Sequence, residues 1–210
     1  MSATRLHARR VALLADVHGN APALAAVLSE ADSEHVDLLV HAGDLTWGSL
    51  VAKTLALIRA YDGRIELVRG NAERAILELA DGTRTSDEEP TPREIWMRER
   101  HDAEAVAFLR SFSENIVVDV EGLGAVRICH GSPRGDTECV TVETSEARVR
   151  DFMADVPETT VATAHTHVQF DRFVGGIRSL NPGSVGMPYE GRRGAFWALL
   201  GPDVELRRTE

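Results

Sequence analysis

The chain has 210 residues, of which 43% are hydrophobic and 27% are charged, and its formal net charge is -10. This length and apolar content predict a single globular domain over residues 1–210, and no repeat of solenoid period divides the sequence. The negative charge disfavours a long nucleic acid held by a basic surface, although short nucleotides are not excluded as ligands.

The first half of the sequence alternates apolar runs with helical patterns. Runs typical of buried strands occupy residues 10–16, 36–44 and 64–71, and helical patterns follow them at residues 21–31, 50–60 and 72–80. Asn20 is expected to cap the first helix, with Pro22 inside its first turn. Such strand–turn–helix units predict a largely parallel sheet covered by helices. Ligands of such sheets bind beyond the carboxyl ends of the strands.

The middle of the chain departs from this alternation. Residues 81–92 are acidic, polar and contain prolines, as is typical of a loop. The amphipathic segment from Arg93 to Phe112 then predicts one long helix. We interpret residues 81–113 as a helical insertion. Its apolar residues are explained most simply as an amphipathic packing stripe, and a cap that narrows substrate choice is the hypothesis that competes with this explanation.

The second half is dominated by short segments bounded by turns. Strands are predicted at residues 115–122, 124–131, 159–165, 168–176 and 195–201, with one helix at residues 145–153. Short strands of this kind favour antiparallel or mixed pairing. The expected fold class is therefore α/β, with two sheets packed face to face and helices outside.

The cysteines and the N-terminal segment bear on location. Cys129 lies in an apolar run and Cys139 has no partner pattern, so neither a disulfide framework nor a zinc ribbon is indicated. The apolar run that Asp16 interrupts is too short for a signal peptide or a membrane span. We expect a cytoplasmic protein without a membrane partner.

Residues that can bind metals follow most of the predicted strands. The set is Asp16, His18, Asp44, Asn71, His130, His165 and His167. Side chains two positions apart on a strand point to the same side, so the Asp-x-His and His-x-His motifs are each expected to deliver two ligands together. All seven are expected to converge at one edge of the sheet.

The chemistry of this set points to transition metals. Carboxylate, carboxamide and imidazole together suit Mn, Fe or Zn better than Ca or an all-sulfur zinc site. Seven ligands are too many for one tetrahedral ion, whereas a bridging carboxylate would let them serve two. The sequence therefore predicts a binuclear metal site.

Five short motifs carry a resemblance to a known family. In order, "DVH", "GD", "GN", "HG" and "HTH" are similar to those of the calcineurin-like metallophosphoesterase superfamily. The segments "ADVHGNAPALAAVL", "HGSPRG" and "NPGSVGMP" resemble its small bacterial and archaeal phosphodiesterase branch. The likeness extends from about Val11 to Pro188 and is weakest between Asp81 and Asn115.

The resemblance implies a four-layer αββα sandwich of two mixed sheets flanked by helices. It also implies that one metal is bound by Asp16, His18 and His167 and the other by Asn71, His130 and His165. Asp44 would bridge the two ions and position the attacking hydroxide, which is its expected catalytic role.

The activity that follows is hydrolysis of a phosphate ester, most simply a phosphodiester. Two divalent ions about 4 Å apart can hold a bridging hydroxide for in-line attack on phosphorus. Mn is the favoured metal, with Fe, Zn and Mg as alternatives. The expected partner is a small phosphate ester, with nucleotides among the candidates, and a homo-oligomer is left open.

One departure concerns the third motif. The family usually has histidine after Gly-Asn, and this residue faces the substrate phosphate, but here Ala72 and then Glu73 follow Asn71. Assistance to the leaving group by an acid is therefore in question. Glu73 could act as the proton donor, although favourable placement in the first turn of a helix explains it more simply.

Two residues are candidates for contact with substrate. The Arg134 guanidinium, in "HGSPRG", matches the geometry of a phosphate, and Asn181, in "NPGS", could line the pocket. A surface role for Arg134 and a turn at Asn181 are the simpler alternatives. Of the remaining histidines, His7, His35 and His101 are interpreted as surface or helix-face residues, and His41 as a hydrogen-bonded core residue.

Two other functions compete with the phosphodiesterase. One is a non-catalytic scaffold, because the retromer scaffold subunit resembles this branch with a degraded metal site, and the Ala72 departure keeps this alternative open. The other is a phosphoprotein serine/threonine phosphatase, or a relative that cleaves dinucleoside polyphosphates, but these usually carry Asp-Arg-Gly soon after the second motif, which "GDLTWGS" lacks.

Overall fold

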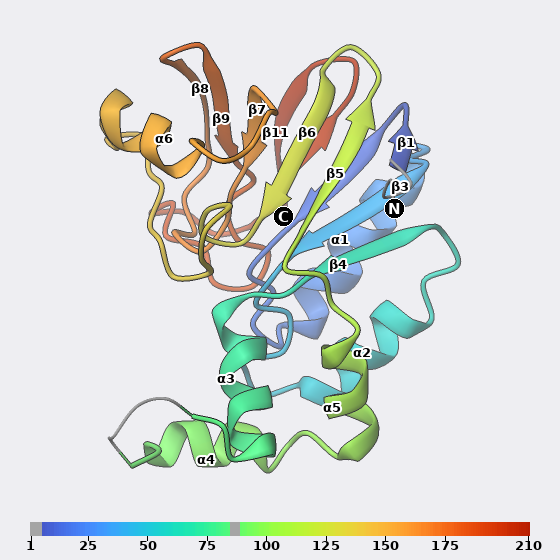
Figure 1. Cartoon of the computed structure of the whole chain (residues 1–210). Helices are drawn as coiled ribbons and strands as arrows, with labels where there is room; N and C mark the ends of the chain where they lie inside the picture. The colour runs from blue at the N-terminus through green and yellow to red at the C-terminus, as the bar shows by residue number, and fades with distance from the viewer. Residues whose placement is uncertain (1–5, 85–88) are drawn as a thin grey trace.

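The computed structural model describes residues 6–84 and 89–210 and contains two sheets packed face to face (Figure 1). The five-stranded sheet has the order β11 (Val204–Thr209), β10 (Ala195–Leu200), β2 (Val11–Leu14), β3 (Leu38–Ala42), β4 (Ile65–Val68). The six-stranded sheet has the order β1 (Leu6–Ala8), β5 (Asn115–Val120), β6 (Gly124–Cys129), β7 (Thr160–Ala162), β9 (Ile177–Asn181), β8 (Phe170–Val174). Both sheets mix parallel and antiparallel pairs, which confirms the predicted fold class.

The alternation of side chains along the strands builds the core. Val11 and Leu13 of β2 point into the space between the sheets, where they join residues of β3, β5 and β6. Ala12 and Leu14 point to the opposite face of the same sheet and pack with α1 (Ala21–Ser33) and α2 (Val51–Arg59). On the outer face of the other sheet, Val149 of α6 (Glu146–Phe152) packs with Cys129 and Val161. The layers therefore run helix, sheet, sheet, helix.

The strand order also explains which elements the sequence did not reveal. The parallel pairs β2–β3 and β3–β4 were expected from the first half, whereas β1, β9 and β11 were missed. β1 has only three residues, and β11 has the half-exposed, polar pattern of an edge strand. Short or polar edge strands such as β1 and β11 carry too little apolar periodicity to be recognised in a sequence. β9 lies inside the sheet, between β7 and β8, so this reason does not apply to it.

The insertion differs from its prediction. The single helix expected from Arg93 to Phe112 is wrong: the chain forms α4 (Pro92–Arg98) and α5 (Ala103–Arg110), and Asp102 caps the second by accepting a hydrogen bond from the Ala105 N–H at 2.8 Å. With α3 (Asn71–Asp81) these helices extend away from the sheets at the bottom of Figure 1. Residues 85–88 of the predicted loop lie outside the described residues.

His101 lies at the break between α4 and α5, and its predicted surface position is also wrong. The side chain is buried, with Nδ1 2.8 Å from the Met97 carbonyl oxygen and Nε2 2.9 Å from the Thr46 hydroxyl. Thr46 follows Asp44 by two residues. The His101–Thr46 bond therefore fastens the insertion to the segment after β3.

Helices in the described part of the chain fall short of what a bilayer crossing needs, either in length or in apolar character.

Asn20 holds the start of α1, as predicted, and offers a test of the fold. Its Oδ1 accepts a hydrogen bond from the Ala23 N–H at 3.3 Å, and its Nδ2 donates to the Gly186 carbonyl at 3.1 Å. Asn20→Ala removes the cap and leaves that carbonyl unpaired, so we expect about 2 kcal/mol less stability and a Tm lower by about 4–8 °C. Circular dichroism on heating measures the change. Ser33→Ala, at the exposed end of α1, should leave the Tm nearly unaltered, and equal loss in both variants would contradict the capping role.

Candidate metal centre

The carboxyl ends of strands from both sheets meet at one place. Asp16 and His18 follow β2, Asp44 follows β3, and Asn71 begins α3 directly after β4. From the other sheet, His130 follows β6, and His165 and His167 follow β7. The structure thus brings together all seven residues that the sequence singled out, in two adjacent groups.

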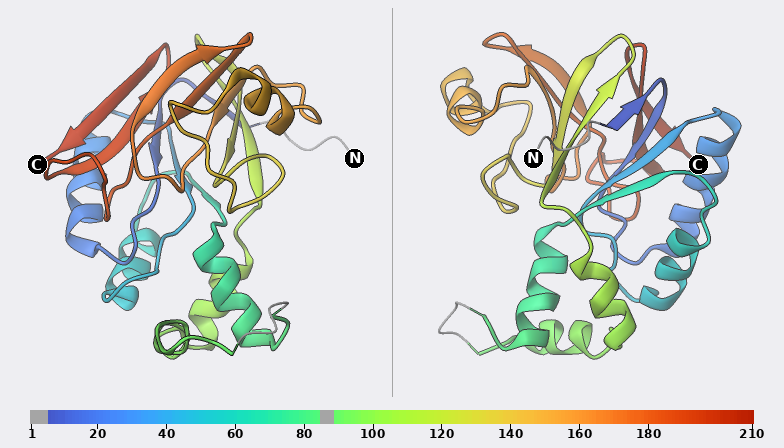
Figure 2. Two further views of the ribbon diagram at one scale, coloured as in Figure 1. Left: turned by 90° about the vertical axis from the view of Figure 1, so that its left-hand side faces the viewer. Right: turned by 45° about the vertical axis from the view of Figure 1, so that its right-hand side comes forward.

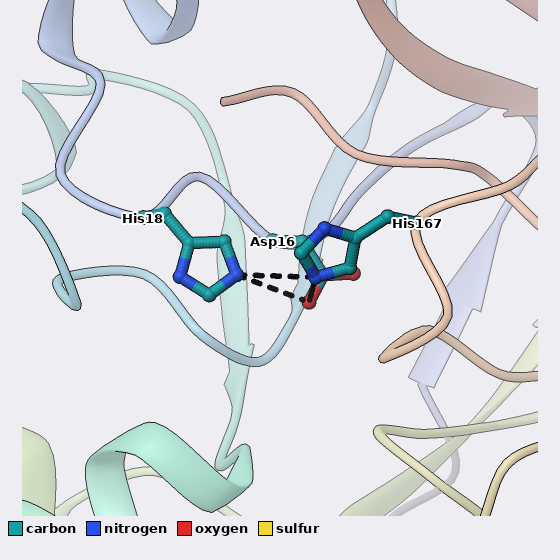
Figure 3. Close-up of side chains that lie close together, drawn as sticks. All are labelled: Asp16, His18 and His167. Atoms are coloured by element: carbon teal, nitrogen blue, oxygen red, sulfur yellow. Dashed lines mark hydrogen bonds and ion pairs between the residues drawn. The ribbon is translucent and has the colours of Figure 1, made fainter. Parts of the chain in front are cut away.

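The first group contains Asp16, His18 and His167, whose ligand atoms all lie within 4.8 Å of one another. Figure 3 shows the three side chains pointing toward one another. The Nε2 atoms of His18 and His167 are 3.2 Å apart. Asp16 Oδ1 lies 3.3 Å from His167 Nε2 and 3.8 Å from His18 Nε2. Asp16 Oδ1 is buried without a hydrogen-bond partner in the described chain. A buried acceptor without a donor, facing two ring nitrogens, fits a cation between them.

The second group contains Asp44, His130 and His165, again with ligand atoms within 4.8 Å of one another. His130 Nε2 lies 3.4 Å from Asp44 Oδ1 and 3.0 Å from the Oδ1 of Asn71, which joins this group. The other oxygen of Asp44 faces the first group, 3.8 Å from His18 Nε2. Asp44 therefore presents one carboxylate oxygen to each group.

Backbone carbonyls fix the orientation of two of the imidazoles. His130 Nδ1 lies 2.8 Å from the Ala42 carbonyl oxygen, and His167 Nδ1 lies 2.6 Å from that of Met187. A carbonyl can only accept, so each Nδ1 carries a proton, and in the neutral form of each ring the lone pair is on Nε2. This is the arrangement found where histidine binds a metal.

The backbone at the ligands explains how the groups form, and it corrects the expected geometry. Asp16 and His18 have φ values of 52° and 49°, and Asp44, His165 and His167 also lie in the left-handed region. The strands β2 and β7 end before these residues, at Leu14 and Ala162. The alternation of side chains along a strand therefore does not place the Asp-x-His pair or the His-x-His pair. His165 and His167 face different groups for this reason. Left-handed non-glycine residues cost energy and gather at functional sites.

Glycine at positions 43 and 70 is required by the closeness of the strands. Gly43 has a φ of 98°, and a Cβ there would lie 2.5 Å from His130 Nδ1. A Cβ at Gly70 would lie 2.2 Å from Asp44 Oδ1. Side chains at these positions would displace the ligands themselves.

Glu73 supports the centre in a way the sequence did not reveal. Its fully buried carboxylate accepts hydrogen bonds from the N–H groups of Asp44 at 2.8 Å, Leu45 at 2.9 Å and Gly70 at 2.9 Å. Burial and the Asp44 charge raise the pKa of Glu73, while these donors oppose the increase. The side chain holds the loops after β3 and β4 in place. It points at backbone N–H groups, which leaves it no role as a proton donor in this arrangement.

Burial and charge set the protonation of the ligands. Burial lowers the pKa of His18 to about 4, against the opposing effect of Asp16, and burial likewise lowers the pKa of His165. Burial also disfavours the charged form of His130, but the carboxylates of Asp44 and Asp16 outweigh it and raise its pKa. Burial raises the pKa of Asp44 to about 6. At neutral pH His18 and His165 are unprotonated, the form that can bind a cation.

The sequence profile of the calcineurin-like phosphoesterase superfamily domain matches residues 10–200. The chain belongs to this superfamily. No curated protein matches the sequence.

Solved structures share the fold over nearly the whole chain. A metallophosphoesterase from Sphaerobacter thermophilus is 26% identical, with a TM-score of 0.73, over 97% of this chain and 89% of that one. The hypothetical protein PH1004 from Pyrococcus horikoshii OT3 is 19% identical, with a TM-score of 0.77, over 98% of this chain and 88% of that one. A novel archaeal phosphodiesterase is 16% identical, with a TM-score of 0.58, over 95% of this chain and 99% of that one.

The two groups open into a cavity of about 410 Å³. It is lined by His18, Asp44, Trp47, Asn71, Ala72, Ala75, Arg93, Glu94, His165, His167, Met187 and Tyr189. Ala72 stands where the family usually has a histidine, and its backbone N–H donates to Asp44 Oδ1 at 2.9 Å. Position 72 of this chain therefore helps to hold Asp44 through its backbone.

The two predicted substrate contacts lie outside the lining of this cavity. Arg134 borders another cavity of about 220 Å³, which His130 of the second group also lines, and pairs with Glu138 at 2.8 Å and Asp151 at 3.1 Å. Asn181 is fully buried, where its Nδ2 donates to the Ala164 carbonyl at 2.9 Å and its Oδ1 accepts from the Gly183 N–H at 2.8 Å. These contacts favour roles in holding loops, and contact with substrate stays a prediction for both.

His41 lies in the core within β3, fully buried as expected. Its Nδ1 accepts a hydrogen bond from the Gly43 N–H at 3.3 Å, and burial lowers its pKa to about 3. The imidazole is therefore neutral at physiological pH, in a strand that leads directly to Asp44.

Proposed function

We propose that this chain is a binuclear metal-dependent phosphodiesterase. In this proposal Asp16, His18 and His167 bind one ion, Asn71, His130 and His165 bind the other, and Asp44 bridges them. The observation that carries the proposal is the orientation of Asp44, whose Oδ2 lies 3.8 Å from His18 Nε2 and whose Oδ1 lies 3.4 Å from His130 Nε2. One carboxylate shared between two groups of donors is what a two-ion centre needs.

The donor set supports first-row divalent metals. Imidazole nitrogens together with carboxylate and amide oxygens suit manganese, iron or zinc. None of the seven residues offers a sulfur ligand, which argues against a thiolate site. Manganese is the metal we favour. When bound, two such ions lower the pKa of water to supply a nucleophile and neutralise charge on the phosphoryl oxygens during in-line displacement.

The residues of the chain prepare this chemistry. The carbonyls of Ala42 and Met187 hold His130 and His167 with their Nε2 lone pairs toward the centre. Glu73 fixes the backbone of Asp44 before any ligand arrives. Preorganised ligands spare the reaction the cost of arranging them.

Ala72 bears on the kind of substrate. An alanine side chain cannot donate a proton, so the leaving group departs with little help from this position. Esters of acidic alcohols are therefore the substrates expected to react fastest. We favour diesters because the motifs resemble the small phosphodiesterase branch of the superfamily.

The test uses protein stripped with a chelator and re-supplied with Mn²⁺, Mg²⁺ or Zn²⁺. We expect hydrolysis of bis-p-nitrophenyl phosphate with Mn²⁺ to exceed that of the metal-free protein by at least about 100-fold, with two ions bound per chain. p-Nitrophenyl phosphate, assayed in parallel, is expected to react more slowly. Turnover of the monoester alone would indicate a phosphatase instead.

A non-catalytic scaffold is the second candidate, and Ala72 is the observation that favours it. It predicts that two ions bind and that neither ester is hydrolysed with any of the three metals. The activity assay separates these two functions, and direct measurement of bound metal shows whether a protein without activity is loaded with both ions.

A further inference from the structure

The cavity above the two donor groups is larger than the reacting phosphate requires. Its volume of about 410 Å³ falls within the range of sites that take a drug-sized ligand, about 300–1,000 Å³. Ala72 and Ala75, on the first turns of α3, leave this space open because their side chains are small. The remaining wall away from the donor groups includes Trp47, Arg93 and Tyr189, which we call the outer subsite.

Arg93 supplies a positive charge to the outer subsite. Arginines elsewhere near the centre are neutralised: Arg74 pairs with Asp136 at 2.6 Å, and Arg69 pairs with Glu114 at 2.7 Å. Arg93 has no carboxylate within ion-pair distance among residues 6–84 and 89–210, and its guanidinium carbon lies 5.9 Å from the centre of the Trp47 ring. An exposed guanidinium that no carboxylate of the described residues neutralises is suited to an anionic group of a ligand.

The acidic neighbour of Arg93 does not cancel this charge. Glu94 lines the same cavity, but its carboxylate lies 3.2 Å from the Arg84 guanidinium and accepts a hydrogen bond from the Thr91 N–H at 2.7 Å. Its charge is therefore directed toward Arg84 and the start of α4.

Two aromatic rings give the outer subsite flat apolar surfaces. The Tyr189 ring stacks on His167, with centroids 4.7 Å apart and an interplanar angle of 25°. With one ring face covered by His167 and 63% of the residue exposed, the opposite face is open. Trp47 supplies a second, half-buried ring. Rings of this kind bind nucleobases by stacking with little dependence on base identity.

The outer subsite is held in place relative to the donor groups. The His101–Thr46 bond of 2.9 Å ties the α4–α5 insertion to the segment that runs from Asp44 to Trp47. The Tyr189 N–H donates to the His167 carbonyl at 3.1 Å. In the left view of Figure 2, α4 lies below the loops of the second half of the chain. Both walls are thus anchored to residues beside the centre.

We infer that the outer subsite recognises a nucleotide that carries a second phosphate group. One phosphate lies over the donor groups, the second pairs with Arg93, and the base stacks on Tyr189 and Trp47. The inference rests on the proposed function for the position of the first phosphate. Charge at Arg93 and flat surfaces at the two rings are the features that this ligand class matches.

The test is calorimetric titration of the Mn²⁺-loaded protein with four probes: phosphate, pyrophosphate, AMP and α,β-methylene-ADP. Arg93→Gln is expected to weaken the binding of pyrophosphate and of α,β-methylene-ADP by about 10-fold or more and to leave the affinity for phosphate unchanged. Arg93→Lys should restore part of the loss. Arg100→Gln is the matched control, because Arg100 stacks on Trp96 in the same insertion and does not line the cavity.

The aromatic wall has a separate signature. Tyr189→Leu is expected to weaken AMP and α,β-methylene-ADP by about 5-fold or more, because a stacked base is lost, and to leave pyrophosphate unchanged. The two variants therefore affect different pairs of probes, which a general loss of structure would not produce.

The outcomes separate this inference from the proposed function. The subsite is rejected if Arg93→Gln binds pyrophosphate as tightly as the unchanged protein does. It is also rejected if Arg93→Gln loses as much affinity for phosphate as for pyrophosphate. A third outcome is that the protein hydrolyses bis-p-nitrophenyl phosphate but binds α,β-methylene-ADP no more tightly than phosphate. This result supports the proposed function and rejects the subsite. Binding that depends on Arg93 in a protein that hydrolyses no ester supports the subsite and rejects the phosphodiesterase.

Discussion

Asp44→Asn is expected to lower kcat/KM for bis-p-nitrophenyl phosphate by about 1,000-fold or more and to reduce bound metal to one ion or fewer per chain. Replacement of groups one shell beyond a metal costs about 10–100-fold, so loss of a ligand shared by both donor groups should cost more. The amide keeps the shape of the side chain but removes the charge between His18 and His130. Steady-state kinetics with saturating Mn²⁺ and elemental analysis of the dialysed protein measure the two effects.

Stability measurements separate this effect from unfolding. Burial raises the pKa of Asp44 to about 6, above the usual value of an aspartate. An acid whose pKa is raised by folding destabilises the metal-free fold once the pH exceeds its unfolded pKa, so removal of the charge should keep or increase the Tm of metal-free protein at pH 7. Asp62→Asn, at an exposed turn, is the matched control and should change neither activity nor metal content. Full activity of Asp44→Asn with two ions bound would reject the bridging role.

The clustering of these seven residues was predictable because they stand at fixed places in the sequence pattern. Asp16, Asp44 and His130 each follow an apolar run, and parallel strands deliver such residues to a common edge. The detailed geometry could not be predicted. Side-chain alternation along a strand failed for His165 and His167, because left-handed backbone after β7 turns them toward different groups.

Residues that act through tertiary contacts were the ones the sequence concealed. His101 resembles any polar residue of an amphipathic helix, and only its contact with Thr46 shows why the helix breaks there. Arg93 lies far from the motifs, and only the packing of the insertion brings it to the cavity. Glu73 was visible beside Asn71, but the helix dipole was a sufficient local explanation. Its three backbone partners, the N–H groups of Asp44, Leu45 and Gly70, come from two separate loops, which no local pattern encodes.

Glu73→Gln should destabilise the metal-free protein by about 3 kcal/mol and lower its Tm by about 6–12 °C. The carboxylate accepts from three N–H groups with two oxygens. A glutamine has one oxygen, so its NH₂ group must face at least one N–H group, and two donors then oppose each other. The remaining bonds also lose their charge assistance. Burial and the Asp44 charge raise the pKa of Glu73, so removal of its charge offsets only part of this loss. Unfolding in urea followed by fluorescence of the tryptophans gives the free energy directly.

The same substitution should weaken binding of Mn²⁺ by about 10–100-fold, because the backbone of Asp44 and Gly70 is no longer held. Glu78→Gln is the matched control on the same helix, since Glu78 pairs with Arg74 at 3.0 Å in a half-exposed position and should contribute about 0.5 kcal/mol or less. With metal at saturation, the pH profile of kcat of Glu73→Gln should keep the shape seen in the unchanged protein. A variant with unaltered stability and metal affinity but a lost limb of that profile would instead make Glu73 a proton donor. The direction of its carboxylate, toward three buried N–H groups, argues for the first result.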